Sequence, residues 1–199
     1  MSILVLASGN AGKLREFSGL LGDLGIEVRP QGDFNVPDAA ETGLTFVENA
    51  LIKARAAARH TGHAAMADDS GLEVDALKGA PGIYSARYAG THGDDAANNR
   101  KLLAALEGVP KAERTARFVC ALAVLRHAED PRPLICQAVW EGRILEAPAG
   151  AGGFGYDPLF HVPDQGCSAA ELPADTKNRL SHRARASQEL RRALPDWWR

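Results

Sequence analysis

The stretch that most constrains the fold is Ala64–Leu77, which reads AAMADDSGLEVDAL. A short apolar run, Ala64–Ala67, is followed by the adjacent acids Asp68 and Asp69, and a second apolar alternation begins after Gly71. A short continuous apolar run is typical of a strand that is buried on both faces, as in α/β sheets. We therefore predict a buried strand that carries acids at its carboxyl end, where ligands bind in α/β sheets.

A simple turn at Asp68–Gly71 is the competing interpretation, because Asp, Ser and Gly are common turn residues. If the segment is extended, successive side chains point to opposite faces, so only one of Asp68 and Asp69 can face a given pocket. Carboxylates on a rigid strand are suited to binding a hard cation and to activating water. The stretch therefore predicts either a turn or the acidic part of a catalytic site.

A strand, a glycine turn and a helix are predicted at the start of the chain. Ile3–Ala7 is apolar, and leucines and a phenylalanine then recur at helical spacing until Gly25. Free N–H groups at such a turn favour an anion, and Lys13 in the first helical turn suits an anionic ligand. The turn is not a Walker loop, and an ordinary strand–helix turn is the alternative. The turn consists of Ser8, Gly9, Asn10, Ala11, Gly12 and Lys13.

A long loop and a capped helix are predicted next. Gln31–Gly43 shows no periodicity and carries Glu41, and loops of this length are often functional. Thr45 and Glu48 form a capping box for a helix that continues to about Arg59. Lys53 lies on this helix, where a lysine is either a surface residue or a contact to a ligand.

The remaining elements predict a mixed sheet in an α/β fold. Thr115–Leu125 and Pro133–Trp140 are long strand-like runs with no helical pattern between them, so they are predicted to pair antiparallel. A helix is expected from Asp94 or Asp95 to about Gly108. Further helical segments are expected at Ser168–Leu172 and Asp175–Leu194. The length suits one domain over residues 1–199, or two small lobes that share a core.

Two segments near the C-terminus are candidates for contacts to a nucleotide. Pro148–Pro158 reads PAGAGGFGYDP, and an aromatic on such glycine-rich backbone can stack on a base; a flexible surface loop is the alternative. The last helical region is basic, which is either a solvated face or a cover over a nucleotide. Its cluster comprises Lys177, Arg179, His182, Arg183 and Arg185.

Composition and apolar runs bear on the compartment and on the partners of the protein. The 25 acidic residues nearly balance the 23 basic ones, which gives no support for bulk affinity for nucleic acid. The three cysteines have no metal-ligand spacing and indicate a reducing compartment. The N-terminus does not read as a signal peptide, and no window reaches the ~20 apolar residues of a membrane span. We therefore predict a cytoplasmic protein with neither nucleic acid nor membrane as a partner.

Five blocks in this order resemble the inosine/xanthosine triphosphate pyrophosphatases, which hydrolyse non-canonical purine nucleoside triphosphates. The blocks are SGNAGK, ETGLTFVENALIKA, ADDSGLEVDALKGAPGIYSARY, PAGAGGFGYDP, and Lys177 with LSHRA. The resemblance runs from residue 3 to about 194 and is greatest to bacterial members. It implies an elongated α/β fold of two lobes around a mixed, twisted sheet, with the active site in the cleft between the lobes. It also implies a homodimer, Mg²⁺ as cofactor, and a nucleoside monophosphate and pyrophosphate as products.

The same resemblance implies roles for individual residues. Asp69 matches the proton acceptor and a metal ligand, and Glu41 and Asp68 match supporting acids at the metal site. Ser8–Lys13 match the triphosphate-binding turn, and Ser70 matches a contact to the substrate. Apart from the resemblance, the charge of Lys53 would help to neutralise the phosphates. The expected nucleotide contacts near the base are Phe154, Gly155, Tyr156, Asp157, Lys177, His182 and Arg183.

Three other functions stay open on the sequence alone. A nucleotide pyrophosphatase with a different base specificity would share the same acids and lysines. A binding module that does not hydrolyse nucleotide would need no base beside the phosphates. A nucleic-acid binder would depend only on the basic C-terminal region.

Overall fold

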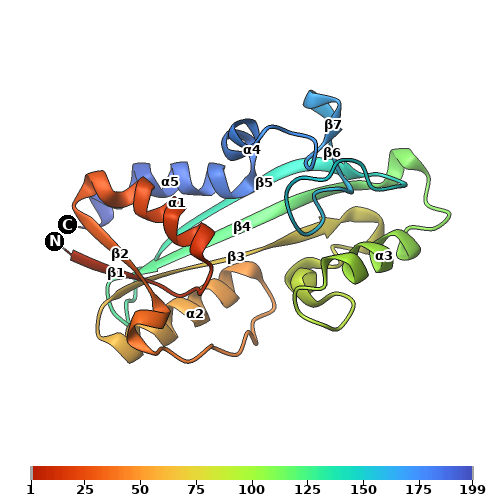
Figure 1. Cartoon of the computed structure of the whole chain (residues 1–199). Helices are drawn as coiled ribbons and strands as arrows, with labels where there is room; N and C mark the ends of the chain where they lie inside the picture. The colour runs from red at the N-terminus through yellow and green to blue at the C-terminus, as the bar shows by residue number, and fades with distance from the viewer. Residues whose placement is uncertain (1, 199) are drawn as a thin grey trace. The chain divides into compact units, whose positions relative to one another are not determined.

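The computed structural model describes residues 2–198, in which seven strands form one mixed sheet of order β2-β1-β3-β4-β5-β6-β7 (Figure 1). The strands are β1 (Ser2–Leu6), β2 (Ile26–Pro30), β3 (Ala64–Val74), β4 (Thr115–Leu125), β5 (Leu134–Ile144), β6 (Phe160–Val162) and β7 (Cys167–Ser168). The α-helices are α1 (Ala11–Leu21), α2 (Phe46–Thr61), α3 (Asp95–Ala105), α4 (Ala174–Leu180) and α5 (His182–Trp197). Short 3₁₀ helices lie at η1 (Gly22–Leu24), η2 (Gln31–Phe34), η3 (Asp75–Leu77), η4 (Gly82–Arg87), η5 (Lys111–Glu113) and η6 (Pro163–Gln165).

The strand pairing confirms the mixed sheet that was predicted. β1 pairs in parallel with β2 on one side and with β3 on the other. β5 and β6 pair antiparallel, and so do β6 and β7. The parallel part is the N-terminal strand–helix–strand unit, because a parallel pair requires a crossover connection such as α1 or α2.

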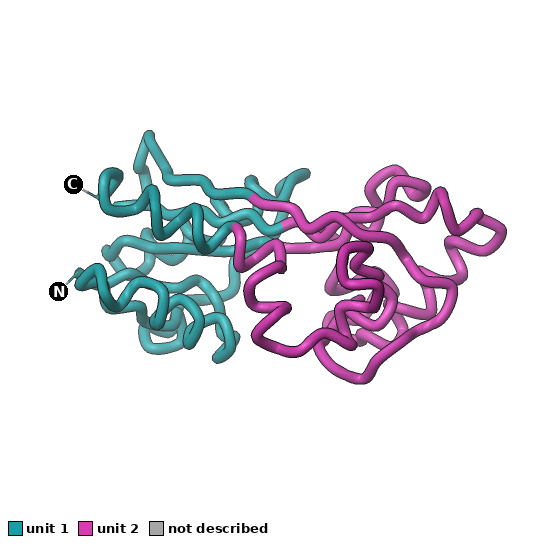
Figure 2. Tube along the Cα trace, turned by 90° about the horizontal axis from the view of Figure 1, so that it is seen from above, with its two compact units in different colours: residues 1–69, 120–137, 186–199 teal, residues 70–119, 138–185 magenta. Residues whose placement is uncertain are grey.

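The chain divides into two compact units, drawn in teal and magenta in Figure 2. Unit 1 comprises residues 1–69, 120–137 and 186–199, and unit 2 comprises residues 70–119 and 138–185. The boundaries fall inside β3, β4, β5 and α5, so these elements contribute residues to both units. Each unit has a hydrophobic core of its own.

The core of unit 1 is rich in alanine. Ala50, Ala54, Ala57 and Ala58 of α2 are buried against Val5, Ala65 and Ala67 of the central strands. Alanine is the best helix former, and its small side chain lets a helix lie close to a sheet. Thr45 caps α2 as predicted, because its hydroxyl oxygen accepts a hydrogen bond from the Glu48 N–H at 3.1 Å. In Figure 1, α1 lies on one face of the unit 1 strands and α2 on the other.

The core of unit 2 is built from larger side chains. Phe118 packs against Phe160 with ring centroids 4.5 Å apart and against Trp140 at 6.4 Å. Leu102 and Leu106, from α3 and its C-terminal end, are fully buried in the same cluster. Aromatic side chains bury more area than aliphatic ones, so a few aromatic residues supply much of the buried apolar area of this core.

The predicted bounds of two elements are wrong. β3 does not end at Asp68 and is not interrupted by a turn, because it continues through the acids to Val74. Pairing in the middle of the sheet and the burial of Leu72 and Val74 outweigh the turn preference of Asp, Ser and Gly. The predicted region Asp175–Leu194 is two helices, which are separated at Ser181.

The segment Ser168–Leu172, which was predicted as a short helix, is not one. Two of its backbone groups bond outside the segment: the Ala169 N–H donates to the Phe160 carbonyl, and the Ala170 carbonyl accepts from the Gly152 N–H. These contacts attach Ala169 to β6 and Ala170 to the glycine-rich loop, and the Glu171 N–H bonds to the Ser168 carbonyl at 3.1 Å, which closes a turn and not an α-helical i→i−4 bond.

The cysteines and the apolar character of the helices were also predicted from the sequence. Cys120 and Cys136 are buried, as predicted for thiols within strands. Within residues 2–198, no helix combines the length and the apolar character that a membrane span requires.

Candidate functional site

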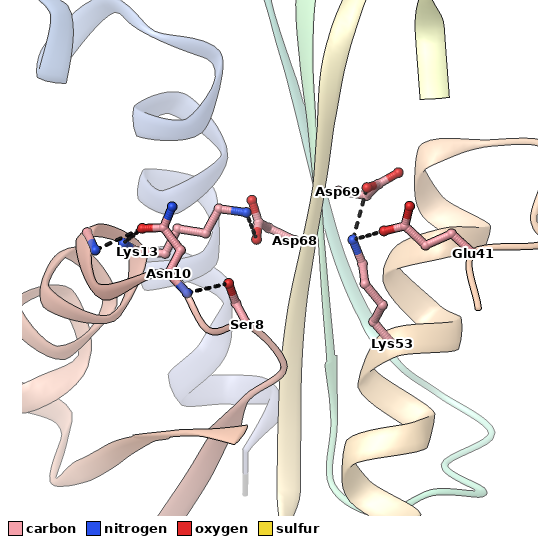
Figure 3. Close-up of polar contacts among 8 residues, drawn as sticks. Ser8, Asn10, Lys13, Glu41, Lys53, Asp68 and Asp69 are labelled. Atoms are coloured by element: carbon pink, nitrogen blue, oxygen red, sulfur yellow. Dashed lines mark hydrogen bonds and ion pairs between the residues drawn. The ribbon is translucent and has the colours of Figure 1, made fainter. Parts of the chain in front are cut away.

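The two adjacent acids of β3 point to opposite faces of the strand, as the extended geometry predicts (Figure 3). Asp68 faces Lys13 of α1, and the Lys13 ammonium lies 2.7 Å from Asp68 Oδ1. Asp69 faces Lys53 of α2, and the Lys53 ammonium lies 3.0 Å from Asp69 Oδ1. Each acid therefore belongs to a different polar group within unit 1.

The turn before α1 is organised by Asn10. The Asn10 side-chain oxygen accepts hydrogen bonds from the Gly12 N–H at 2.8 Å and the Lys13 N–H at 3.1 Å, and the Asn10 N–H donates to Ser8 Oγ at 3.2 Å. Asn10 is thus the N-cap of α1, which was not predicted. Two N–H groups that the sequence interpretation left free for an anion are held by this cap. Lys13 is placed in the first helical turn as predicted, with its ammonium on Asp68.

Lys53 joins two carboxylates on the other face of β3. Its ammonium lies 2.8 Å from Glu41 Oε1 in addition to its contact with Asp69. All three side chains are largely buried, with 17% of Lys53, 25% of Glu41 and 12% of Asp69 exposed. The structure thus brings together three predicted site residues from a loop, a helix and a strand.

The electrostatics of this group favour a base at Asp69. Burial raises the pKa of Asp69 above its usual value, and the neighbouring Glu41 and Asp68 carboxylates add to the rise, while the Lys53 ammonium opposes it. Burial alone would lower the pKa of Lys53, but the Asp69 and Glu41 carboxylates outweigh burial and raise it. Lys53 therefore stays charged, and Asp69 is a stronger base than a surface aspartate.

The loop that carries Glu41 is attached to α2 through Asn49. The side-chain oxygen of Asn49, which is fully buried, accepts a hydrogen bond from the Gly43 N–H at 2.9 Å. A Cβ atom at Gly43 would lie 2.6 Å from Glu48 Cβ and 2.8 Å from Asn49 Oδ1, so only glycine allows this approach. Asn49 and Lys53 are one helical turn apart and hold the same loop at two points. The sequence interpretation missed Asn49.

The acids could contribute to a cation site but do not form a complete one alone. In residues 2–198, no three His, Cys, Asp or Glu side chains are grouped so as to hold a metal ion. Asp69 Oδ2 is buried and has no hydrogen-bond partner among the described residues. A buried carboxylate oxygen in this state fits a hard cation, which takes its ligands from carboxylates and water. Of the three predicted metal ligands, Glu41 and Asp69 both form an ion pair with Lys53. Asp68 instead contacts Lys13 on the opposite face of β3.

A second set of predicted residues meets within unit 2. Phe154 is 65% exposed, and the Lys177 ammonium lies 4.6 Å from the centroid of its ring. Lys177 also forms an ion pair with Asp157, whose Oδ2 accepts a hydrogen bond from the Phe154 N–H at 2.8 Å. Gly153 has a φ of +72°, and a side chain there would collide with the Asp157 carboxylate. The buried carboxylate therefore fixes both the loop and the lysine beside an exposed aromatic ring.

The other predicted residues of unit 2 lie in different surroundings. The His182 ring stacks on Phe118, with centroids 4.9 Å apart and 14° between the ring planes. Arg183 follows in the first turn of α5 and is half-buried. The Tyr156 hydroxyl donates to the Ser85 carbonyl at 2.8 Å, so Tyr156 anchors the loop through a buried contact. Ser70 Oγ is buried without a hydrogen-bond partner in the part of the chain that is described.

Sequence reasoning also missed two residues of α3 that contact the glycine-rich loop. Asp95 and Asn99 both bond to the backbone of Gly155. The sequence identified Asp95 only as a candidate cap of its helix. No local pattern reveals the contact, because it joins residues about 60 positions apart.

These features define an α/β protein whose lysines and carboxylates suit a phosphate-bearing ligand, with an exposed aromatic side chain on a second unit. The chain belongs to the Ham1 family, whose sequence profile matches residues 4–193. A protein of Vibrio cholerae named dITP/XTP pyrophosphatase is 57% identical over 196 residues, which is 98% of this chain and 98% of that protein. A protein of Pseudomonas aeruginosa with the same name is 61% identical over 191 residues, or 96% of each chain.

Solved structures agree with this family assignment. The structure of a HAM1 protein from Coxiella burnetii superposes with a TM-score of 0.95 at 51% identity, covering 98% of this chain and 100% of the other. The structure of a nucleoside-triphosphatase, dITP/XTP pyrophosphatase, from Mycobacterium abscessus superposes with a TM-score of 0.82 at 44% identity and covers 94% and 97% of the two chains. The α/β fold predicted from the sequence is thus the fold of this family.

Proposed function

We propose that this protein hydrolyses the triphosphates of non-canonical purines, namely ITP, dITP and XTP, to the nucleoside monophosphate and pyrophosphate. One observation carries the proposal: a buried aspartate with a raised pKa lies beside a lysine shared with a second carboxylate. The names of the relatives from Vibrio cholerae and Pseudomonas aeruginosa support it. Removal of such nucleotides from the cellular pool is the role that follows.

Asp69 is the proposed general base. A water molecule held at Asp69 gives its proton to the carboxylate, and its oxygen forms a new bond to phosphorus at the α–β linkage. The bridging phosphorus–oxygen bond breaks, and pyrophosphate leaves. Lys53 stays protonated beside Asp69, so it is suited to hold the carboxylate in place and to attract the phosphates.

Magnesium is the proposed cofactor, and Glu41 and Asp69 are the residues that would hold it. Bound there, it would neutralise phosphate charge and lower the pKa of a bound water. Asp68 contributes in another way, because it fixes Lys13 at the turn that is proposed to bind the triphosphate. We propose that the N-terminal turn, comprising Ser8, Gly9, Asn10, Ala11, Gly12 and Lys13, contacts the phosphates, and that Ser70 also contacts the substrate.

The residues of unit 2 are proposed to bind the purine base. Phe154 offers an exposed ring on which a base can stack. Inosine and xanthosine carry an oxo group at position 6, where adenosine carries an amino group. Donors such as His182 and Arg183 match the oxo group and leave an amino group without a partner, and hydrogen-bonded sites of this kind discriminate by ~10⁴ or more. The other proposed contacts near the base are Gly155, Tyr156, Asp157 and Lys177.

Arg183→Ala tests the proposal on base selection. We expect the catalytic efficiency on ITP to fall by about ten- to a hundredfold, because a charged hydrogen bond to the oxo group is lost, while the low efficiency on ATP changes little. Steady-state kinetics on both nucleotides measure the ratio. Arg185→Ala is a matched control, since Arg185 is exposed and its guanidinium bonds to the Val139 carbonyl. An ITP-to-ATP preference that is unchanged in Arg183→Ala would contradict this role.

A panel of nucleotides tests the reaction itself. We expect hydrolysis of ITP, dITP and XTP in the presence of Mg²⁺, little hydrolysis of GTP, ATP and dUTP, and pyrophosphate as the released product. Chromatography of the products, with and without the metal, measures both points. Release of orthophosphate would contradict the reaction, preference for dUTP would indicate another base specificity, and binding without turnover would indicate a binding module.

Two further proposals come from membership of the family alone. We propose a homodimer and a cytoplasmic location. Light scattering of the purified protein and fractionation of cells measure the two properties.

A further inference from the structure

We propose that Asp95 and Asn99 of α3 are positioning residues that hold the backbone N–H and carbonyl of Gly155 and thereby set the affinity for the purine base. We call these two side chains the Gly155 clamp. The inference rests on the proposed function, in which the loop at residues 154–157 binds the base. Neither residue touches substrate in this proposal, because each acts through the loop backbone.

The clamp engages both polar groups of a single residue. Asp95 Oδ2 accepts a hydrogen bond from the Gly155 N–H at 2.7 Å, and Asn99 Nδ2 donates one to the Gly155 carbonyl at 2.8 Å. The two side chains lie four residues apart on α3, so they project from the same face of the helix. An acceptor placed for the N–H and a donor placed for the carbonyl fix the orientation of the two peptide groups on either side of the Gly155 Cα atom.

The helix also fixes the clamp itself. Asn99 Nδ2 donates a second hydrogen bond to the Asp95 carbonyl at 2.9 Å, which orients the amide with its donor toward Gly155. The adjacent residue, Asn98, bonds to the backbone at the end of η4. Its side chain accepts a hydrogen bond from the Ala89 N–H at 2.7 Å and donates one to the Ala86 carbonyl at 3.3 Å. The two asparagines thus bond different loops.

Gly155 is the flexible point at which such a clamp matters. Its φ of +61° lies in the left-handed region, which glycine adopts freely, and it directly follows the exposed Phe154. Asp157 binds the Phe154 N–H on one side, and Tyr156 is anchored by its hydroxyl on the other. The Phe154 carbonyl also accepts a hydrogen bond from the Asp157 N–H at 3.2 Å. Without the clamp, the Gly155 N–H and carbonyl would lose their side-chain partners, and the Gly155 φ and ψ angles would be held only through these neighbouring anchors.

The expected consequence is a change in base affinity and not in chemistry. A loop that is ordered before binding spares the entropy that ordering would otherwise cost, so affinity rises with preorganisation. Asp95 is exposed, and its loss removes no core contact, so the fold of unit 2 should survive it. A purely structural residue would lower thermal stability without changing the ratio of affinities for ligands with and without a base.

The test compares Asp95→Ala and Asn99→Ala with the wild type in the full-length protein. We expect KM for ITP to rise about five- to tenfold in each variant, which is the effect of losing one hydrogen bond to a charged or amide group, with kcat within about twofold. Inorganic tripolyphosphate, which has no base, should inhibit all three proteins with the same inhibition constant. A parallel rise of this constant and of KM would overturn the proposal, because damage would then extend to the phosphate contacts.

Conservative exchanges separate hydrogen bonding from charge. Asp95→Asn keeps an acceptor oxygen for the Gly155 N–H, so its KM should stay within about twofold of the wild type. Asn99→Asp replaces the donor by an acceptor facing the Gly155 carbonyl, so its KM should rise at least as much as in Asn99→Ala. Equal damage from Asp95→Asn and Asp95→Ala would overturn the clamp and indicate a role for the charge.

Asp94→Ala is the matched control for stability of the helix. Asp94 caps α3 by accepting from the Ala97 N–H at 2.9 Å and does not contact Gly155 in the structure. Its loss should lower the melting temperature while leaving KM for ITP unchanged, and a rise in KM equal to that of Asp95→Ala would overturn the proposal. Wild-type protein that hydrolyses no purine triphosphate would instead refute the proposed function. Active wild type with unchanged KM in both alanine variants would refute the clamp alone.

Discussion

Asp69→Asn is expected to lose about 10²–10⁴-fold in kcat while nucleotide still binds, because the variant lacks a proton acceptor beside the water. Asparagine is nearly isosteric and keeps an oxygen for the Lys53 ammonium, which lies 3.0 Å from Asp69 Oδ1 in the wild type. The loop, the lysine and the phosphate contacts should therefore stay in place. The predicted defect is chemical and not one of folding.

Single-turnover kinetics at saturating Mg²⁺ measure the chemical step of Asp69→Asn, and calorimetry of ITP binding measures its affinity. Glu73→Gln is the matched control, since Glu73 lies on the same strand, its carboxylate is 3.7 Å from the Arg117 guanidinium, and it is not one of the proposed site residues. We expect Glu73→Gln to keep wild-type turnover. Near-normal turnover in Asp69→Asn would remove Asp69 from the role of base.

Lys53→Met is expected to destabilise the protein by about 3–5 kcal/mol and to lose most activity. The ammonium is the cation that Glu41 and Asp69 share, at 2.8 and 3.0 Å. Methionine fills a similar volume but leaves two largely buried carboxylates facing each other without a counter-charge. The burial that already raises the pKa of Asp69 then acts without the opposing lysine, so the pKa of Asp69 rises further and its ionised form, which accepts the proton, is disfavoured.

Thermal unfolding of Lys53→Met with and without Mg²⁺ measures this effect and tests the proposed cation site. A ligand that binds only the folded state stabilises it, so Mg²⁺ should raise the melting temperature of the variant more than that of the wild type. Lys53→Arg keeps the positive charge and should unfold closer to the wild type. Lys111→Met, at an exposed position, controls for loss of a surface charge. Equal melting temperatures for Lys53→Met and wild type would contradict the pairing.

Local patterns predicted much of the secondary structure. The Thr45 capping box begins α2 where it was expected, and the apolar run at residues 115–125 forms β4 with the predicted bounds. Hydrophobic periodicity and helix caps act over a few residues, so they can be recognised in the sequence alone. The DDSG segment shows the limit of such signals, since its turn-forming residues lie within an 11-residue strand.

The sequence predicted the residues of the candidate site better than it predicted which residues contact each other. The sequence indicated Lys13, Lys53, Asp68 and Asp69 as polar residues of interest, and extended geometry predicted that the two acids face apart. Which lysine meets which acid could not be predicted, since the Lys13–Asp68 pair joins residues 55 positions apart. The same holds for the contact between Asp95 and Gly155. Pairing of this kind depends on how helices pack on the sheet.

The sequence by itself determined the α/β class, the family, and the residue types available for chemistry, because those depend on short-range periodicity and on motifs in a fixed order. Only the tertiary structure decided that Asp68 fixes Lys13 while Asp69 shares Lys53 with Glu41. It also decided that a helix of unit 2 holds the glycine-rich loop. The physical reason is that charges and hydrogen bonds act over a few ångströms in space, and the distance between residues in space is set by packing and not by their separation along the chain.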